Sequence, residues 1–511
     1  MQLFDIDDSL KESLAVTDIV RSRSWQELQN NVFAVARLYA EQFGLLPGDH
    51  IALHIGNRVE FIEALLAGIV AGLWVTPVNT HLTRPEALYI LKDCSARLLV
   101  HDSDHTILSQ GTDVPALNIE SWRRFAPCMD KVEDTSGMFL RPDFPSGGTM
   151  LYTSGTTGKP KGVMRAKPAL LMDALSRMKQ GGKAFGLSGV GPHLVTGPLY
   201  HAAPMLFALY DLLNGAPVII MKSWDEKRFT ELVTEFHVTT THLVPTMMVR
   251  LLKYRDQQPL NPDLLNVAES LKLVLHGAAP VAPHTKAAML DWWGDILVEY
   301  WGGSEAGVTT LVKSAEWRRK PGTVGKPLPH FRVYVGDDSG NPTAAKEGQL
   351  YCCHQDLAQV FSYHNDPDKT RQAHPKPHVF SIGDRGYVDD EGFVYLSGRM
   401  SNMIISGGVN IYPAEVEHAI LEHPMVQDCA VIGVPDPEWG EQVHAVVELV
   451  SGDPEAEKIT CDDCNSLRSF LQSRLARFKI PRHFHIIEAI PRMPTGKVRN
   501  QDLFRMIGLP A

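Results

Sequence analysis

Apolar and polar positions alternate between helical and strand periods over the first hundred residues. After Ser24, apolar side chains recur at helical spacing as far as Tyr39, and Ser24 with Glu27 forms a capping-box pattern. Short apolar runs at 51–55 and 97–100 predict buried strands, and helical patterns at 60–72 and 85–94 follow the first of them. Such alternation predicts a doubly wound α/β layer with a parallel sheet.

The same alternation returns from about residue 183 to residue 301 and predicts a second α/β layer. Its predicted strands are 195–196, 218–221, 240–244, 271–275 and 296–300. From 320 to 396 the pattern changes to short strands separated by turn signals, which is typical of an antiparallel barrel or meander.

The last hundred residues mix strands and helices and predict a small α+β domain. Its strands are expected at 429–433 and 443–450, and its helices at 413–421 and 466–478. We place the boundary before this domain at the polar stretch 399–402.

Composition excludes several classes of protein. The 511 residues are 44% hydrophobic and 21% charged, which is ordinary for a folded globular chain, and the net charge is −10. An acidic chain binds nucleic acid or an anionic membrane poorly, so we expect neither partner. The apolar stretch 61–78 is interrupted by Glu63, Gly68 and Gly72, so we expect no integral membrane segment.

The N-terminus lacks the pattern of a signal peptide, and the seven cysteines are scattered and odd in number. We therefore expect a cytoplasmic protein. Cys461 and Cys464 lack a second pair at regular spacing, which disfavours a zinc site. The sequence leaves a homodimer open.

The segment 149–163 carries the clearest chemical signal, because an apolar strand leads into a loop of glycine, hydroxyl and lysine side chains. Its glycines are Gly155, Gly158 and Gly162. Its hydroxyl and cationic side chains are Thr153, Ser154, Thr156, Thr157, Lys159 and Lys161. Close backbone approach, hydroxyl donors and positive charge together favour a polyphosphate ligand. Pro160 follows Lys159, so the loop is not a Walker A motif.

The run 152–162 resembles the phosphate loop of the adenylate-forming superfamily, which includes acyl-CoA synthetases, nonribosomal-peptide adenylation domains and luciferases. Further motifs follow in the family's order over nearly the whole chain. The resemblance implies a large N-terminal domain (1–398) of two doubly wound α/β layers plus a β-barrel. A hinge (399–402) and a small mobile α+β C-terminal domain (403–511) would follow.

The resemblance also implies a nucleotide site. Residues carried over as ATP contacts are Thr153, Ser154, Gly155, Thr156, Thr157, Lys161, Gly277, Ala278, Trp301, Gly302, Ser304, Asp384 and Arg399. By resemblance Trp301 would stack on adenine, Ser304 would touch the α-phosphate and Glu305 would hold Mg²⁺. Asp384 would accept hydrogen bonds from both ribose hydroxyls, and Arg399 would contact the ribose or the α-phosphate.

Three positions in these motifs depart from the family pattern, and one segment has a rival interpretation. The family usually has Tyr and Thr in place of Trp301 and Ser304, and Thr in place of Ile382. Segment 302–306 also approaches the GxSxG nucleophile elbow, but its final glycine is out of position. That interpretation also leaves the phosphate loop unexplained.

The remaining candidate residues serve the reacting groups. By resemblance Lys497 would be the catalytic lysine of adenylation, and His201 would lie near the reacting carboxylate. Ser401 takes the hinge position, where the family commonly has Asp or Lys. Gly407 and Gly408 would line the tunnel of the acceptor.

The function so implied is ATP-dependent activation of a carboxylic acid to an acyl-adenylate, with Mg²⁺ as cofactor. Coenzyme A is the expected acceptor, and cations around Arg474 and Arg477 are candidates for its phosphates. The alternative is an amide ligase that passes the acyl group to an amine or amino acid, with His201 as the group that takes its proton. The sequence does not identify the acid.

Overall fold

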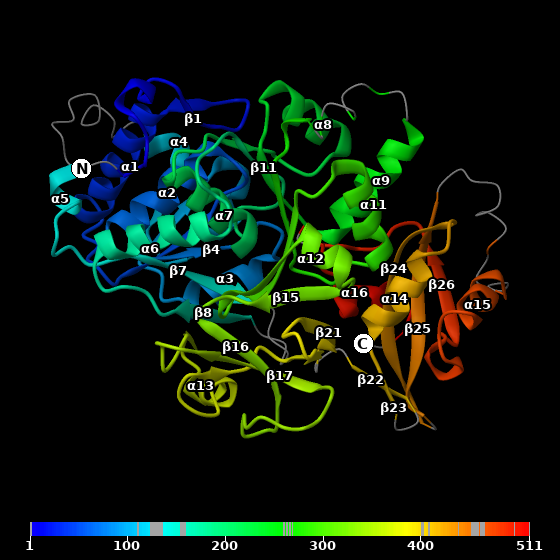
Figure 1. The fold of residues 1–511 in the computed structure, drawn as a ribbon. Helices are drawn as coiled ribbons and strands as arrows, with labels where there is room; N and C mark the ends of the chain where they lie inside the picture. The colour runs from blue at the N-terminus through cyan, green and yellow to red at the C-terminus, as the bar shows by residue number, and fades with distance from the viewer. Residues whose placement is uncertain are drawn as a thin grey trace.

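The computed structural model describes residues 3–109, 112–122, 136–153, 160–258, 261, 264, 267, 269–399, 403–406, 409–437, 439–450, 459, 465–494 and 496–509. Three sheets and the helices around them make up this part of the chain (Figure 1).

The first sheet has seven strands, in which β7, β4, β3, β5 and β6 run parallel and β8 and β18 extend one side antiparallel. In spatial order the strands are β18 (Phe361–Tyr363), β8 (Lys161–Arg165), β7 (Gly148–Thr153), β4 (Trp74–Pro77), β3 (His50–His54), β5 (Leu98–His101) and β6 (Ala116–Asn118). Its helices are α1 (Trp25–Glu41), α2 (Val59–Val70), α3 (Arg84–Asp93), α4 (Ile119–Trp122) and α5 (Ser136–Phe139).

A fourteen-stranded sheet combines a parallel part with an antiparallel part. The parallel strands are β1 (Leu14–Thr17), β10 (Val218–Ile220), β9 (His193–Val195), β11 (Thr240–Leu243), β12 (Leu273–His276) and β13 (Leu297–Gly303). The antiparallel strands are β2 (Ser22–Ser24), β14 (Gly307–Lys313), β15 (Thr323–Pro327), β16 (Phe331–Gly336), β17 (Gly348–His354), β19 (Val379–Phe380), β20 (Asp384–Val388) and β21 (Val394–Arg399). The predicted change from parallel α/β structure to antiparallel strands is thus confirmed.

One apolar core joins the two α/β layers. Helix α2 is buried at every position, and the same cluster takes in residues of α1 and of α7 (Ala202–Leu213). The other helices of these layers are α6 (Leu171–Ala184), α8 (Glu226–Glu235), α9 (Pro245–Gln257), α11 (Pro283–Trp293), α12 (Ser314–Arg319) and α13 (Pro367–Ala373). A helix that is buried on all sides has apolar residues on every face. This explains the strongly apolar sequence from residue 61 onward, most of which belongs to α2.

The chain after residue 403 forms a smaller α+β unit with a five-stranded sheet. Its strands are β22 (Ile404–Ser406), β23 (Val409–Ile411), β24 (Val426–Asp436), β25 (Gly440–Leu449) and β26 (His483–Ile487). Its helices are α14 (Pro413–Leu421), α15 (Asn465–Gln472) and α16 (Asn500–Met506). This unit is called the C-terminal domain below.

The predicted helix over 466–478 is too long. Helix α15 ends at Gln472, and a 3₁₀ turn, Arg477–Lys479, follows it. Ala476 between them is extended, with φ −59° and ψ 141°, so the helical hydrogen-bond ladder cannot pass through it.

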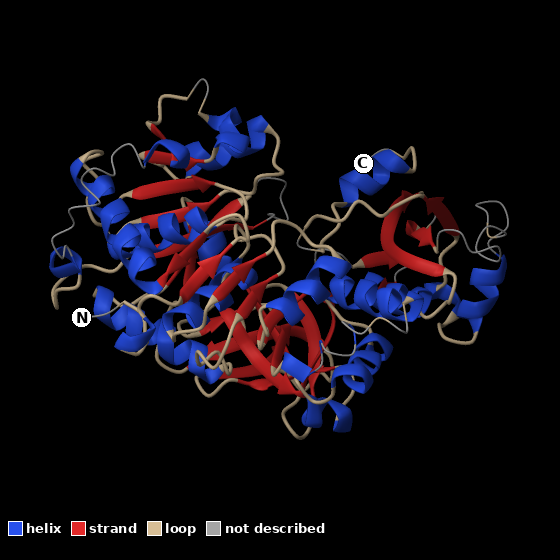
Figure 2. Cartoon of the chain, turned by 90° about the horizontal axis from the view of Figure 1, so that it is seen from above, coloured by secondary structure: helices blue, strands red, loops and turns tan. Residues whose placement is uncertain are grey.

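Figure 1 shows the sheet of the C-terminal domain beside α9 and α11, and Figure 2 shows this domain from above as a separate lobe. Within the described residues, no helix has the length and apolar character that a membrane crossing requires.

Candidate active site

The candidate site lies where several strands end. Strand β7 ends at Thr153, directly before the predicted phosphate loop, and parallel strands β12 and β13 end at His276 and Gly303. Carboxyl ends of parallel strands are where α/β sheets bind ligands. Thr153 is paired in register with Lys161, so the two ends of the predicted loop lie side by side.

Lys161 forms an ion pair with Asp366. That hydrogen bond raises the pKa of Lys161, and it lowers the pKa of Asp366. Both groups are therefore charged at neutral pH. The residues that flank the loop, Thr153 and Lys161, thus belong to a hydrogen-bonded strand pair. The ion pair between Lys161 and Asp366 fixes the second of them.

Trp301 and Asp384 form a buried hydrogen bond. The indole Nε1 donates to Asp384 Oδ2 over 2.7 Å, and each residue is only 5% exposed. Trp301 lies on β13 and Asp384 begins β20, where it is in register with Arg399. The bond joins the residue predicted to stack on adenine to the one predicted to hold the ribose.

The turn after β13 is tightly built around Ser304 and Glu305. A Cβ at Gly302 would lie 1.9 Å from the carbonyl oxygen of Gly307, so only glycine fits there. The Ser304 carbonyl oxygen accepts from Arg165 Nε over 2.9 Å. The Tyr363 hydroxyl donates to Glu305 Oε1 over 3.2 Å, which orients that carboxylate.

This turn fits a magnesium ion. Mg²⁺ is usually bound by one or two carboxylates together with substrate phosphates and water, and Glu305 supplies one oriented carboxylate. The described residues contain no cluster of three or more side chains that would hold a metal by themselves. Sequence reasoning missed Arg165 and Tyr363, because both lie far from Glu305 along the chain.

His201 and Lys497 lie far apart in the sequence, and the charge of Lys497 acts on the His201 imidazole. His201 is the N-cap residue of α7. Burial, together with the positive charge of Lys497, lowers the pKa of His201 to about 3, so the imidazole is neutral at pH 7. Lys497 follows Gly496, whose added Cβ would lie 3.0 Å from Thr246 Oγ1 at the start of α9.

A buried ion pair lies beneath the strand ends. Lys286 Nζ on α11 contacts Glu299 Oε2 on β13 at 2.6 Å, and both side chains are buried. His276 Nε2 lies 4.0 Å from the same oxygen. Gly277 follows, and a Cβ there would lie 2.8 Å from the Tyr300 ring. These contacts pack the ends of β12 and β13 closely together.

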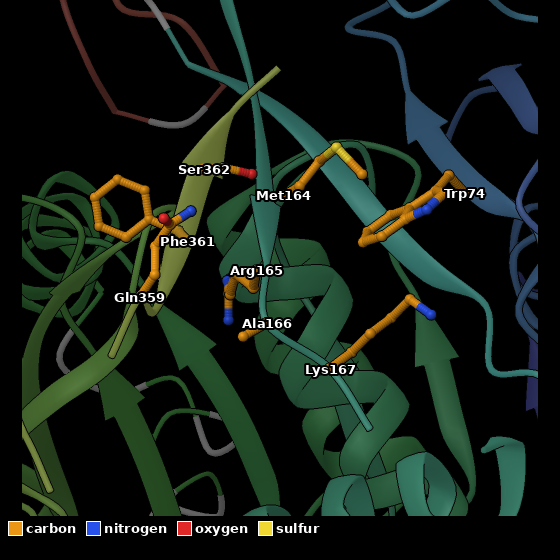
Figure 3. A pocket seen from close by; sticks show the side chains of 8 residues that line it. All are labelled: Trp74, Met164, Arg165, Ala166, Lys167, Gln359, Phe361 and Ser362. Atoms are coloured by element: carbon orange, nitrogen blue, oxygen red, sulfur yellow. The ribbon is translucent and has the colours of Figure 1, made fainter. Parts of the chain in front are cut away.

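A small pocket of about 260 Å³ lies at the far end of β8, away from Lys161 (Figure 3). It is lined by Trp74, Met164, Arg165, Ala166, Lys167, Gln359, Phe361 and Ser362. Lys167 Nζ lies 5.1 Å from the centre of the Trp74 ring and donates to Ser146. The pocket contains none of the residues predicted to bind the nucleotide.

Several predicted residues fall outside the described part of the chain and stay predictions. They are Ser154, Gly155, Thr156, Thr157, Gly158, Lys159, Ser401, Gly407 and Gly408. Arg399 is described only through its backbone. Of the basic residues near the end of α15, Arg474 pairs with Glu422 at 2.7 Å and Lys479 with Glu415 at 2.6 Å.

Comparison with known proteins accounts for both parts of the chain. The family model described as AMP-binding enzyme matches residues 8–361, and the one described as AMP-binding enzyme C-terminal domain matches residues 415–497.

Relatives match over nearly their whole length. The chain is 30% identical over 498 residues to a 2-succinylbenzoate–CoA ligase of Geobacillus kaustophilus, covering 97% of this chain and 95% of the relative. It is 32% identical over 473 residues to a feruloyl-CoA synthase of an Amycolatopsis species, covering 91% and 90%. The ATP-bound crystal structure of MatB from Rhodopseudomonas palustris superimposes with a TM-score of 0.79 at 26% identity, covering 99% and 97% of the two chains.

Proposed function

The chain belongs to the AMP-binding enzyme family, and we propose that it activates a carboxylic acid with ATP and transfers the acyl group to the thiol of coenzyme A. One observation carries the proposal: the loop of the C-terminal domain that carries Lys497 meets the N-terminal domain at Val244 and Thr246, directly after β11, and the charge of Lys497 acts on His201.

In the first step a carboxylate oxygen of the acid attacks the α-phosphorus of ATP. The bond to the β-phosphate oxygen breaks, pyrophosphate leaves with its electron pair, and an acyl-adenylate forms. Such a phosphoryl-centred displacement asks the protein mainly to position groups and to stabilise charge. The ammonium of Lys497 offsets negative charge on the phosphates, and the Trp301–Asp384 pair holds the nucleoside. Mg²⁺ held by Glu305 would lower the charge repulsion between the phosphates and the incoming carboxylate.

In the second step the thiol sulfur of coenzyme A attacks the acyl carbon. The thioester forms, the acyl–phosphate bond breaks, AMP leaves and the thiol proton passes to solvent. A thiol has a pKa of about 8 to 9, so part of it is ionised before it attacks.

In the domain arrangement of this structure, His201 is poorly suited to take a proton from an amine acceptor. An attacking amine must lose a proton after it has bonded to the acyl carbon, so an amide ligase benefits from a base with a pKa near neutrality. Burial and the charge of Lys497 lower the pKa of His201 to about 3 in this arrangement, so the imidazole is a weak base here at neutral pH. A neutral imidazole instead offers one hydrogen-bond donor and one acceptor next to the reacting carboxylate.

Mass spectrometry of the products tests the proposal. The protein is given ATP, Mg²⁺ and a panel of acids that includes 2-succinylbenzoate, ferulate and a long-chain fatty acid. One set contains coenzyme A, and the other contains mixed amino acids. We expect a CoA thioester and AMP in the first set. Amides without a thioester would overturn the choice of acceptor, and no AMP with any acid would overturn the activation itself.

Two further points belong to this proposal. Gly408→Leu is expected to block thioester formation and to spare pyrophosphate release, since a side chain there would obstruct the acceptor tunnel that the resemblance implies. We place the reaction in the cytoplasm, because the odd number of scattered cysteines suits a reducing compartment.

A further inference from the structure

A lysine of the N-terminal domain reaches into the C-terminal domain. Lys253, on α9, donates from Nζ to the carbonyl oxygen of Gln427 and to its side-chain Oε1, each over 2.7 Å. It also donates to the carbonyl oxygen of Val426 over 3.2 Å. Both acceptor residues begin β24. An ammonium group has three N–H bonds, so these contacts account for all of its donors.

Lys253 is partly withdrawn from water, so its ammonium depends on these three hydrogen bonds. Burial lowers its pKa to about 8, while Asp428, Glu448 and Cys429 of the C-terminal domain act in the opposite direction. A buried ammonium is costly unless every donor is bonded. The three acceptors all belong to the C-terminal domain, so Lys253 loses these bonds together when that domain moves away.

The contact is continuous with the loop that carries Lys497. Asp428, the next residue of β24, accepts from Arg492 Nε over 2.6 Å and from its Nη2 over 2.7 Å. Arg492 Nη1 in turn donates to the carbonyl oxygen of Gly496 over 2.8 Å. Gly496 directly precedes Lys497. A shift of β24 relative to α9 therefore moves the catalytic lysine as well.

The same helix meets this loop a second time. A Cβ at Gly496 would lie 3.0 Å from Thr246 Oγ1, in the first turn of α9. Thr246 and Lys253 are seven residues apart and so lie on one face of the helix. This face of α9 therefore meets the C-terminal domain at two positions. Figure 1 shows the sheet of that domain beside α9.

We propose that Lys253 is a positioning residue that keeps the C-terminal domain, and with it Lys497, over the nucleotide during acid activation. The resemblance implies that the C-terminal domain is mobile, so Lys253 must release Val426 and Gln427 if this domain moves for the transfer of the acyl group. The inference rests on the proposed function, because it assigns Lys253 to the first of its two steps.

The test measures the two steps separately in Lys253→Met. Methionine keeps an unbranched apolar stem and removes the ammonium group. Pyrophosphate release is measured with ATP, Mg²⁺ and the acid of the panel above that the wild type uses fastest. AMP release is measured with the corresponding acyl-adenylate and coenzyme A. Hydrogen bonds from a charged donor are strong enough that the first rate should fall about 10- to 100-fold. The second rate should stay the same or rise.

Two more variants sharpen the test. Lys253→Arg restores a cation and should recover part of the first rate. Arg250→Met removes a cation from the same helix, but Arg250 pairs with Glu226 inside the N-terminal domain. It should leave both rates unchanged. Equal losses in both steps for Lys253→Met, or no loss in the first, would overturn the inference.

Hydrogen exchange separates this inference from the proposed function. In the wild type and both Met variants, amide exchange is followed at the start of β24 and along α9 with ATP and Mg²⁺ but no acid. Lys253→Met should speed exchange at the start of β24, and Arg250→Met should not. Unchanged exchange in Lys253→Met would overturn the positioning role whether or not the protein turns over any acid. A wild type that releases no pyrophosphate would overturn the proposed function instead.

Discussion

Asp384→Asn should weaken ATP binding by about 1.5–3 kcal/mol, or about 10- to 150-fold in Kd. The estimate comes from the geometry of the carboxylate. Its Oδ2 already accepts from Trp301 Nε1 over 2.7 Å, and the group is almost completely buried. Asparagine keeps the shape and an oxygen acceptor for the indole, so the loss reports the missing charge in the bonds that we predict with ribose.

Two further variants separate binding from folding. Asp384→Ala leaves the buried indole N–H of Trp301 unpaired, which should lower the free energy of unfolding by about 1–3 kcal/mol. Trp301→Phe removes that donor but keeps an aromatic ring, so it should reduce ATP affinity less than Asp384→Asn does. Urea unfolding of all three variants measures the stability part.

The binding assay is calorimetric titration of the acid-free protein with ATP and Mg²⁺. Asp356→Asn, at an exposed carboxylate on the surface, serves as the control and should bind ATP as the wild type does. Titration with the preferred acid alone should give the same affinity in all variants. Wild-type ATP affinity in Asp384→Asn would refute the reasoning, and Asp384 would then serve only to hold Trp301.

The remaining predictions concern Lys497, the buried ion pair and the response to acid. Lys497→Ala should slow pyrophosphate release by a factor that corresponds to about 3–4 kcal/mol. Acyl transfer from a supplied acyl-adenylate should keep its rate. An equal loss in both rates would contradict a role of Lys497 in the first step. Glu299→Gln leaves Lys286 buried without a counter-charge. It should lower the free energy of unfolding, measured by urea titration, by about 3–5 kcal/mol. A loss below about 1 kcal/mol would contradict this prediction. Burial lowers the pKa of His242 to about 3, so the unfolded chain binds a proton below pH 6.5 that the folded chain does not. Stability should therefore fall with acidity, by about 1 kcal/mol from this residue between pH 7 and pH 5.5. Urea unfolding of His242→Phe at both pH values should show a smaller loss of unfolding free energy than the wild type shows. An equal loss in the two proteins would contradict the contribution of His242.

The amino-acid sequence alone determined the local elements. Ser24 and Glu27 form the predicted capping box at the start of α1, and α14 spans the predicted residues because Pro413 suits a first helical turn. Local chemistry decides such features, since the groups that make each contact lie within a few residues of one another. For the same reason the phosphate-loop motif predicted nucleotide chemistry from one continuous segment.

The sequence was less informative where a local pattern ended without a clear signal. It predicted a helix through residue 478, whereas α15 ends at Gln472. It also did not predict β26, which pairs with β25 in the sheet of the C-terminal domain, or α16, which packs on that sheet. Their stability comes from that packing, and a short element has little periodicity of its own.

Only the tertiary structure decided which distant residues become partners. The indole of Trp301 bonds to Asp384, although the two are 83 positions apart. Lys253 likewise bonds to Gln427 across 174 positions. Residue type shows that a side chain can donate or accept, but its partner is chosen by how sheets and domains pack. The residue types therefore indicate the chemistry of this site, whereas the packing of the sheets sets its geometry and the docking of the C-terminal domain against α9 sets the position of Lys497.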